Sequence, residues 1–394
     1  MKKILTLSLI AFSSVLYADF SQQEFVYKDP RVMGMGSANT AVGGYSSAVF
    51  YNPAGLINIK KSHGIEVELL GLSVAASQKM QDFANDLSDA ADTENSEDIS
   101  KVLQDYSGEA FNITVANYSS VSYHTEDDLA WSVGLLASGD INLLPHANSG
   151  NAGLLEAHGR AYSGLQLGVA QNFGEVLPGL PGELTIGVGA KFISQKSYDA
   201  SLDVAEIDAN SDDLAQYLQD TYEVDNSGFA VDLGVLYAPF PSDYWNPTIG
   251  LSVMNIGTLN FDDAYGAQPL SVNLGVSVSP KTEYADFIIA VDYVDALGSQ
   301  QALVYDSQSA KYISSDISYE VLRHLRAGVS AQVLDNSWAT LTLNGGLYQG
   351  AYTMGVDFQL TVLKLQAATY QEQLGGEMGQ LEDRRYVVGL GIGW

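Results

Sequence analysis

The sequence contains no cysteine, so neither a disulfide framework nor a thiol-based site is available to the chain. Basic residues are scarce: 18 Lys and Arg stand against 47 Asp and Glu, which gives a formal net charge of −29. Such acidity argues against nucleic acid as a partner. Beyond the N-terminal stretch, no segment approaches the roughly 18–20 consecutive apolar residues of a membrane-spanning helix. If the chain crosses a membrane, it must therefore do so as a closed β-barrel.

Motifs for catalysis and metal binding are also missing. No G-x-S-x-G element occurs, and the histidines lack the spacing of metal ligands. They are His63, His124, His146, His158 and His324. The sequence predicts no catalytic residue, no metal ligand and no cofactor. A hydrolase with a Ser–His arrangement on one barrel wall stays open as a minor alternative.

The N-terminal 18 residues have the pattern of a secretory signal peptide. Lys2 and Lys3 precede an apolar stretch that ends at Leu16, and Ala18 is a small residue at a cleavage position. We expect the mature chain to begin at Asp19 and to be exported.

The C-terminal segment 386–394 alternates without a break. Tyr386, Val388 and Leu390 lie on one side of an extended chain with Ile392 and Trp394, because successive strand side chains point to opposite faces. The other side carries Val and Gly and no charge, which is typical of the closing strand of a transmembrane barrel. A buried core strand of a soluble sandwich is the alternative.

Period-2 segments recur along the whole chain. They predict strands at 64–76, 111–123, 129–138, 161–173, 183–197, 228–239, 247–258, 270–279, 286–297, 322–333, 338–348, 351–360, 364–371 and 385–394. Their number is even, as in bacterial single-chain barrels, and short and long connections alternate along the chain. Periplasmic turns and extracellular loops produce that alternation, whereas a soluble sandwich does not require it. We expect 385–394 to pair with 64–76 and close the barrel, with Trp394 resembling the terminal aromatic read by the insertion machinery.

The second face of these strands is polar or very small. Its charges would be costly against lipid and acceptable in a lumen. The candidate lumen residues are Lys191, Asp232, Asn273, Asp292, Asp357 and Gln359. We interpret their role as hydrogen bonding to a plug rather than as transport.

Residues 19–63 are different in kind. The run 29–56 is rich in Gly, Ala and Ser and has little period-2 pattern. A barrel of this size is wider than the eight-stranded kind that side chains alone can fill. We therefore predict that 19–63 forms a plug inside the barrel, packing closely on Gly-lined walls.

The same run, DPRVMGMGSANTAVGGYSSAVFYNPAGL, resembles the N-terminal region of the FadL-like outer-membrane superfamily. Segments 228–239 (GFAVDLGVLYAP), 250–257 (GLSVMNIG) and 369–386 (TYQEQLGGEMGQLEDRRY) are most similar to the PorV and conjugal-transfer TraF-type members. The resemblance implies a fourteen-stranded barrel with an N-terminal plug that passes hydrophobic molecules and releases them sideways into the bilayer. Asn52, Pro53 and Ala54 match the plug signature, and no ligand-pocket residue carries over.

Two of the long connections have helical periodicity. In 77–110 the apolar residues recur near every 3.6 positions, and 198–227 carries a similar pattern. Such helices either gather a hydrophobic ligand on their apolar faces or simply pack on the barrel rim. The candidate ligand contacts of the first are Met80, Phe83, Leu87, Leu103 and Tyr106.

These observations predict an all-β protein in the outer membrane of a Gram-negative bacterium, with a signal peptide (1–18), a plug (19–63) and a 14-stranded antiparallel barrel (64–394). The first functional hypothesis is transport of small hydrophobic molecules, fatty-acid or hydrocarbon-like. The second is a structural or assembly barrel of a secretion or conjugal transfer apparatus, which would bind a protein partner. Outer-membrane lipid and the insertion machinery are expected partners in both.

Overall fold

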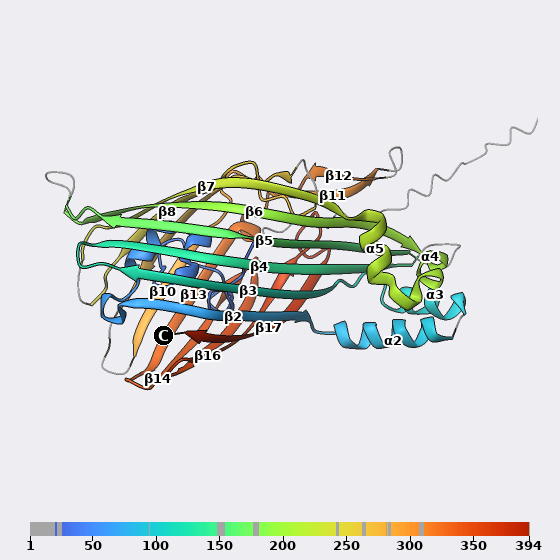
Figure 1. The fold of residues 1–394 in the computed structure, drawn as a ribbon, viewed down its shortest axis with the longest axis horizontal. Helices are drawn as coiled ribbons and strands as arrows, with labels where there is room; N and C mark the ends of the chain where they lie inside the picture. Colours follow the sequence, from blue (N-terminus) through green and yellow to red (C-terminus); the bar gives the residue numbers. More distant parts are fainter. Residues whose placement is uncertain are drawn as a thin grey trace, which may run out of the picture.

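The computed structural model describes residues 20–21, 26–93, 95–147, 154–175, 181–241, 244–261, 265–280, 282, 285–306 and 311–393. Its body is a closed barrel in which every strand pairs antiparallel with two neighbours (Figure 1). The strands are β2 (Ile65–Ser77), β3 (Phe111–His124), β4 (Leu129–His146), β5 (Leu154–Asn172), β6 (Glu183–Asp203), β7 (Val224–Ala238), β8 (Thr248–Gly257), β9 (Ser271–Val278), β10 (Asp286–Tyr293), β13 (Leu325–Asp335), β14 (Ala339–Tyr348), β15 (Ala351–Leu360), β16 (Leu363–Gln373) and β17 (Glu382–Gly393). The predicted fourteen-stranded antiparallel barrel is confirmed.

The barrel closes where the last strand meets the first. In β17, Val388 pairs with Val74 of β2 and Leu390 pairs with Leu72. Val388 is 62% exposed on the outer face, whereas its neighbour Val387 is 5% exposed and faces inward. The alternation in the sequence therefore separates an apolar outer face from a lumen face, as predicted. Trp394 and the predicted signal peptide lie outside the described residues.

Three neighbouring strands, β4, β5 and β6, extend beyond their predicted ends. The predicted connection 139–160 is largely strand, because β4 runs to His146 and β5 starts at Leu154. Four helices cover the outer face of these extensions: α2 (Met80–Asp92), α3 (Ser96–Asp105), α4 (Val204–Ala209) and α5 (Leu214–Tyr222) (Figure 1). This cover buries apolar outward residues of the extensions, among them Leu155 and Leu202. Among the described residues, no helix is both long and apolar enough to cross a bilayer.

The predicted connection 298–321 contains strands that the sequence did not predict. β11 (Gln301–Asp306) and β12 (Lys311–Asp316) form a hairpin, and β1 (Phe20–Ser21) pairs with β11. The short helix α6 (Val321–His324) then leads into β13. These strands form a sheet separate from the barrel.

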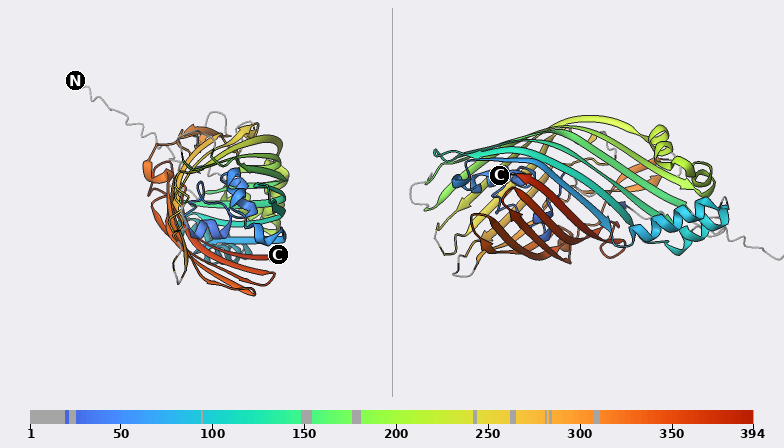
Figure 2. Two further views of the ribbon diagram at one scale, coloured as in Figure 1. Left: turned by 90° about the vertical axis from the view of Figure 1, so that its left-hand side faces the viewer. Right: turned by 60° about the horizontal axis from the view of Figure 1, so that its bottom comes forward.

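Residues 26–59, here called the inner segment, lie inside the ring of strands (Figure 2). The segment consists of helix α1 (Pro30–Gly34) and the 3₁₀ turns η1 (Ser46–Phe50) and η2 (Pro53–Asn58), and η3 (Lys61–His63) links it to β2. Its approach to the wall is so close that a Cβ on Gly187 of β6 would stand 2.2 Å from the Ala54 amide nitrogen. Only glycine fits there. This contact is of the kind expected from the sequence, in which small residues of the segment pack closely on a glycine of the wall.

The contact at Gly187 predicts a specific destabilisation. Gly187→Ala forces the inner segment or the wall to move, and overpacking of this kind costs about 1–3 kcal/mol. We expect a lower unfolding midpoint in urea, measured in detergent micelles by circular dichroism. Gly345→Ala is the matched control, because its Cβ would meet nothing closer than 3.9 Å. Equal midpoints for the two variants would contradict the packing described.

Candidate functional site

Asn52 joins the inner segment to the barrel wall. Its side-chain nitrogen donates to the carbonyls of Thr40 (2.7 Å) and of Val235 in β7 (3.2 Å). Its side-chain oxygen accepts from the Ala54 amide at 3.0 Å, which caps η2. Pro53 occupies the first position of η2, where a missing N–H costs nothing. The motif is thus a helix cap that also reaches the wall.

Two of the predicted lumen carboxylates hold the inner segment. Asp292 of β10 accepts the backbone amides of Asn39 and Thr40, each at 2.6 Å. Asp357 of β15 lies 3.1 Å from the Nε of Arg31 in α1. Both contacts agree with the interpretation that lumen polar residues bind the inner segment.

Lys191 and Asp232 pair with each other across β6 and β7. The Lys191 Nζ lies 3.1 Å from the Asp232 Oδ1, and both residues are fully buried. Asn255 completes the group: its side-chain oxygen accepts from Lys191 at 2.6 Å and its amide donates to Asp232 at 2.8 Å. The group therefore joins the neighbouring wall strands β6, β7 and β8.

The two remaining predicted lumen residues differ in environment. Asn273 of β9 is buried and donates to the Ser252 hydroxyl at 3.2 Å. Gln359 of β15 is only partly buried and donates to the carbonyl of Thr361 at 3.0 Å. The structure therefore brings together most of the predicted lumen residues, with Gln359 at the margin.

A second polar cluster lies between the inner segment and β14–β17, and the sequence analysis missed it. Glu372 is fully buried and forms an ion pair with Lys28 of the inner segment. The Tyr348 hydroxyl also donates to Glu372, at 3.1 Å. The period-2 pattern of the strand indicates that Glu372 faces inward. Its ion-pair partner, Lys28, could not be predicted from the spacing of residues in the sequence.

A further polar path links β17 with β4 and β5. Arg385 lies 2.5 Å from Asp383 and donates to the Asn142 side-chain oxygen at 3.0 Å. Asn142 donates to Asp140 at 2.9 Å, and Arg160 lies 2.6 Å from Asp140. Charged groups of β17, β4 and β5 are therefore linked inside the barrel, past β2 and β3, which lie between β17 and β4 in the sheet.

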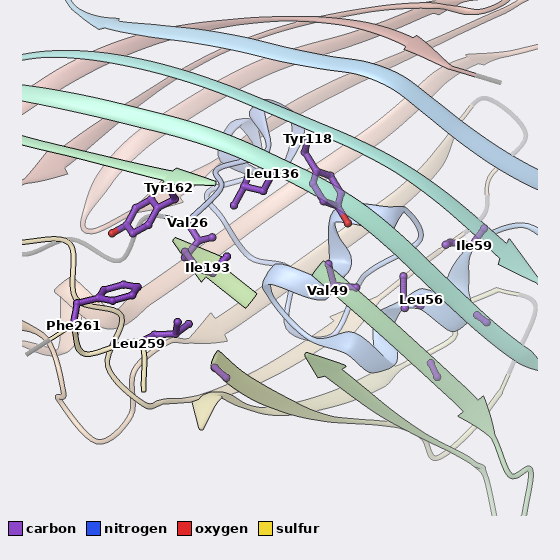
Figure 3. Packing of buried hydrophobic residues seen from close by; sticks show 13 residues of the cluster. Val26, Val49, Leu56, Ile59, Tyr118, Leu136, Tyr162, Ile193, Leu259 and Phe261 are labelled. Atoms are coloured by element: carbon purple, nitrogen blue, oxygen red, sulfur yellow. The ribbon is translucent and has the colours of Figure 1, made fainter. Parts of the chain in front are cut away.

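The lumen contains one extended apolar cluster. It is formed by buried residues from the inner segment, from β3–β7 and from the chain after β8, and it extends along the barrel (Figure 3). This apolar column consists of Val26, Val49, Leu56, Ile59, Tyr118, Ala130, Leu136, Tyr162, Ala170, Ile193, Ala230, Leu259 and Phe261. Buried ion pairs also occur on these strands, Lys191–Asp232 on β6 and β7 and Arg160–Asp140 on β5 and β4.

An outer groove lies on the wall formed by β5, β6 and β7. It is lined by Ser163, Gly164, Phe192, Ile193, Ser194, Ser227, Gly228, Phe229 and Thr258. The exposed rings of Phe192 and Phe229 stand 4.9 Å apart between their centroids. Ile193 belongs to both the groove and the apolar column. On the inner side, Ile193 and Leu259 occupy the space left by Gly164 and Gly228, since an added Cβ would stand 2.8 and 2.9 Å from their side chains.

The predicted ligand contacts of the loop helices are already covered by protein. Phe83 and Leu103 are fully buried, and Met80, Leu87 and Tyr106 are partly buried in the same cluster. That cluster also contains outward-facing residues of the strand extensions. The placement corresponds to the alternative interpretation, in which the helices pack on the barrel rim.

A row of ionisable residues joins the extended ends of β4, β5 and β6. The Nε2 atoms of His146 and His158 lie 3.3 and 3.4 Å from the two carboxylate oxygens of Glu156, and the His158 Nδ1 lies 2.8 Å from Asp199. The row lies at the extended ends of the strands, where residues of α2, α3, α4 and α5 pack with the neighbouring outward residues. Within the described residues, no group of three His, Asp or Glu is placed to hold a metal ion.

The row changes the protonation of its two buried members. Burial alone would lower the pKa of His158, but its contacts with Asp199 and Glu156 outweigh burial and raise the pKa to about 9. Burial would raise the pKa of Glu156, but its contacts with His146 and His158 lower the pKa to about 2. At neutral pH the pair is an imidazolium and a carboxylate.

The chain matches one family model over residues 49–345, a family described as "F plasmid transfer operon, TraF, protein". No curated protein matches it. Among solved structures it is similar to the toluene transporter TbuX of Ralstonia pickettii, with 13% identity, a TM-score of 0.53, and 93% and 98% of the two chains covered. A mutant of the monoaromatic hydrocarbon channel TodX is similar with 12% identity, the same TM-score and the same coverage. At these identities the solved structures support the fold alone.

The His158 row predicts a pH-dependent stability. A histidine whose folded-state pKa is raised stabilises the fold fully below its unfolded value of about 6.5. That contribution is lost as the pH rises through about 9. We expect the urea midpoint in micelles to fall between pH 6.5 and 9.5 in the wild type and to change less in His158→Gln. His124→Gln, outside this row, is the control and keeps the wild-type profile; a His158→Gln profile parallel to the wild type would contradict the assignment.

Proposed function

The chain belongs to the family described as "F plasmid transfer operon, TraF, protein", and from this premise we propose that it is an outer-membrane barrel that passes small hydrophobic molecules. The membrane is the outer membrane of a Gram-negative bacterium, and the cargo is hydrocarbon-like or fatty-acid-like. The barrel acts as a transporter rather than an enzyme. The inner segment acts as the plug that closes the lumen between passages.

The apolar column is the observation that carries this proposal. It extends along the lumen beside buried ion pairs such as Lys28–Glu372 and Lys191–Asp232. A hydrophobic molecule would follow the apolar residues and avoid the ion pairs, because displacing buried ion pairs costs far more than parting apolar contacts. Side chains such as Leu259 and Ile193 contribute no hydrogen bonds that a passing molecule would break.

The outer groove supports an exit toward lipid. Ile193 lines the groove and belongs to the apolar column, and Leu259 of the same column packs against Gly228 at the groove. Phe192 and Phe229 offer an aromatic surface at the opening. The fold is similar to those of a toluene transporter and a monoaromatic hydrocarbon channel. This similarity supports the same class of cargo by analogy of fold.

A structural or assembly barrel is the second candidate. The lumen network from Lys28 to Arg160 supports it, since a barrel that serves as a scaffold has no need of an open path. In that case we expect a periplasmic or surface protein to co-purify with the barrel, and the deletion strain to lose assembly of that partner rather than uptake.

The transport proposal predicts that filling the outer groove blocks uptake. Ser163 and Ser194 are exposed on the outer face, so Ser163→Trp with Ser194→Trp fills the groove without disturbing the lumen. We expect a deletion strain to take up radiolabelled toluene or a medium-chain fatty acid several-fold more slowly than the wild type. The wild-type gene restores uptake and the double variant does not.

Ala331→Trp is the control for that experiment. Ala331 is a small residue, partly exposed on β13, and it lies outside the groove. The control variant should restore uptake fully. Unchanged uptake of both compounds in the deletion strain would exclude the transport proposal and leave the scaffold as the better account. Equal rescue by both Trp variants would exclude the groove as the route.

A further inference from the structure

We infer that the barrel lumen contains a binding site for a small anion, at which Arg326 is the main ligand. The site is an internal cavity of about 80 Å³ between the inner segment and the walls of β6 and β13, which is room for an ion and several water molecules. This inference does not rest on the hydrophobic route, because its evidence is the charge of the cavity lining.

The charge of the cavity lining is opposite to that of the chain. Among the described residues, three cationic ones line it, Lys28, Lys191 and Arg326, and no Asp or Glu does. The chain as a whole has 47 acidic and 18 basic residues. A cavity lined at random from this composition would carry mostly acidic residues. The three cations around this small cavity therefore indicate that it holds an anion.

The three cations are not equally compensated. Lys28 has an ion pair with Glu372, and Lys191 has one with Asp232. Arg326 is 4% exposed, and its Nη1 donates only to backbone carbonyls, those of Arg323 (2.6 Å) and Leu325 (3.0 Å). Among the described residues, no carboxylate lies within the 4.0 Å of an ion pair with it.

Asp292 stands opposite Arg326 in the register of β10 and β13. Its Oδ2 accepts the amides of Asn39 and Thr40 at 2.6 Å. Its Oδ1 has no hydrogen-bond partner among the described residues, and neither oxygen forms an ion pair with Arg326 within 4.0 Å. The ring of Tyr348 covers one face of the guanidinium at 4.2 Å, which leaves the charge buried without a carboxylate of its own. Burying such a charge is costly unless an anion accompanies it.

The chemistry of the site limits the ligand. A guanidinium binds planar oxyanions through paired donors, and a lysine acts as a point charge. The cavity volume excludes large molecules. The ligand class is therefore a small anion, either a halide or a short carboxylate such as formate. Gln268 and Gln300 each present a buried oxygen without a hydrogen-bond donor in the described structure, and water beside the anion supplies that donor.

The test is the anion dependence of stability. The full-length barrel is purified in a non-ionic detergent, and its thermal midpoint is measured at constant ionic strength in gluconate, chloride, bromide and formate. We expect at least one small anion to raise the wild-type midpoint by a few degrees over gluconate, which is too large for the cavity. If formate raises the thermal midpoint and the halides do not, the site binds a carboxylate. If the halides raise the midpoint and formate does not, the site binds a halide.

The variant Arg326→Gln should lose this shift, and in gluconate it should be at least as stable as the wild type, because it no longer buries an uncompensated charge. Lys364→Gln is the control: Lys364 pairs with Glu68 at 2.9 Å and does not line the cavity, so this variant keeps the shift. Absence of any anion effect in the wild type, or an equal effect in Arg326→Gln, would overturn the inference.

A second measurement does not depend on the folding of the variant. Wild-type crystals soaked in bromide should give an anomalous peak within hydrogen-bond distance of the Arg326 guanidinium. If formate rather than halide gives the thermal shift, the same position should show formate density in crystals grown with formate. Water alone at that position in both soaks would overturn the inference.

Discussion

The hydrogen bonding between the inner segment and the barrel wall is the constraint on which the rest of the structure depends. A fourteen-stranded barrel is too wide for wall side chains to fill, and the backbone of any segment placed inside must satisfy its polar groups there. Asp292 accepts two amides of the segment, and Asn52 donates to a wall carbonyl. Glycines of the wall, such as Gly187, allow the backbone of the inner segment to come close enough to form these hydrogen bonds.

This constraint gives the lumen two kinds of contact. Carboxylates and cations hold the segment at β10, β15 and β16, and the charges there are expensive to separate. Toward β3–β7 the contacts combine the apolar column with hydrogen bonds from Ser138 to the Val26 carbonyl and from Asn52 to the Val235 carbonyl. The cavity beside Arg326 touches both regions, because Lys191 of β6 and Val26 of the apolar column also line it.

The parts of the structure that follow from local pattern were predictable. Alternation such as that of Tyr386 to Ile392 located every barrel strand, because the period is a property of neighbouring residues. The extension of β5 was missed, since α4 and α5 cover Leu155 and Ala157 while Glu156 and His158 face inward. Pairs such as Arg385 with Asn142 join strands 243 residues apart. Their contact depends on the register of the whole closed sheet, which no local spacing encodes.

The most direct measurement of the central claim uses the absence of native cysteine. A Cβ on Gly168 of β5 would stand 3.7 Å from the Cβ of Val49 in the inner segment, close to the usual separation in a disulfide. Val49→Cys with Gly168→Cys should therefore form one intramolecular disulfide in the exported protein, visible as a mobility shift that reducing agent reverses. The account predicts this bond in the double variant and in neither single variant. If the double variant folds and both of its thiols remain free after oxidation, that result would contradict the placement of the inner segment against the wall.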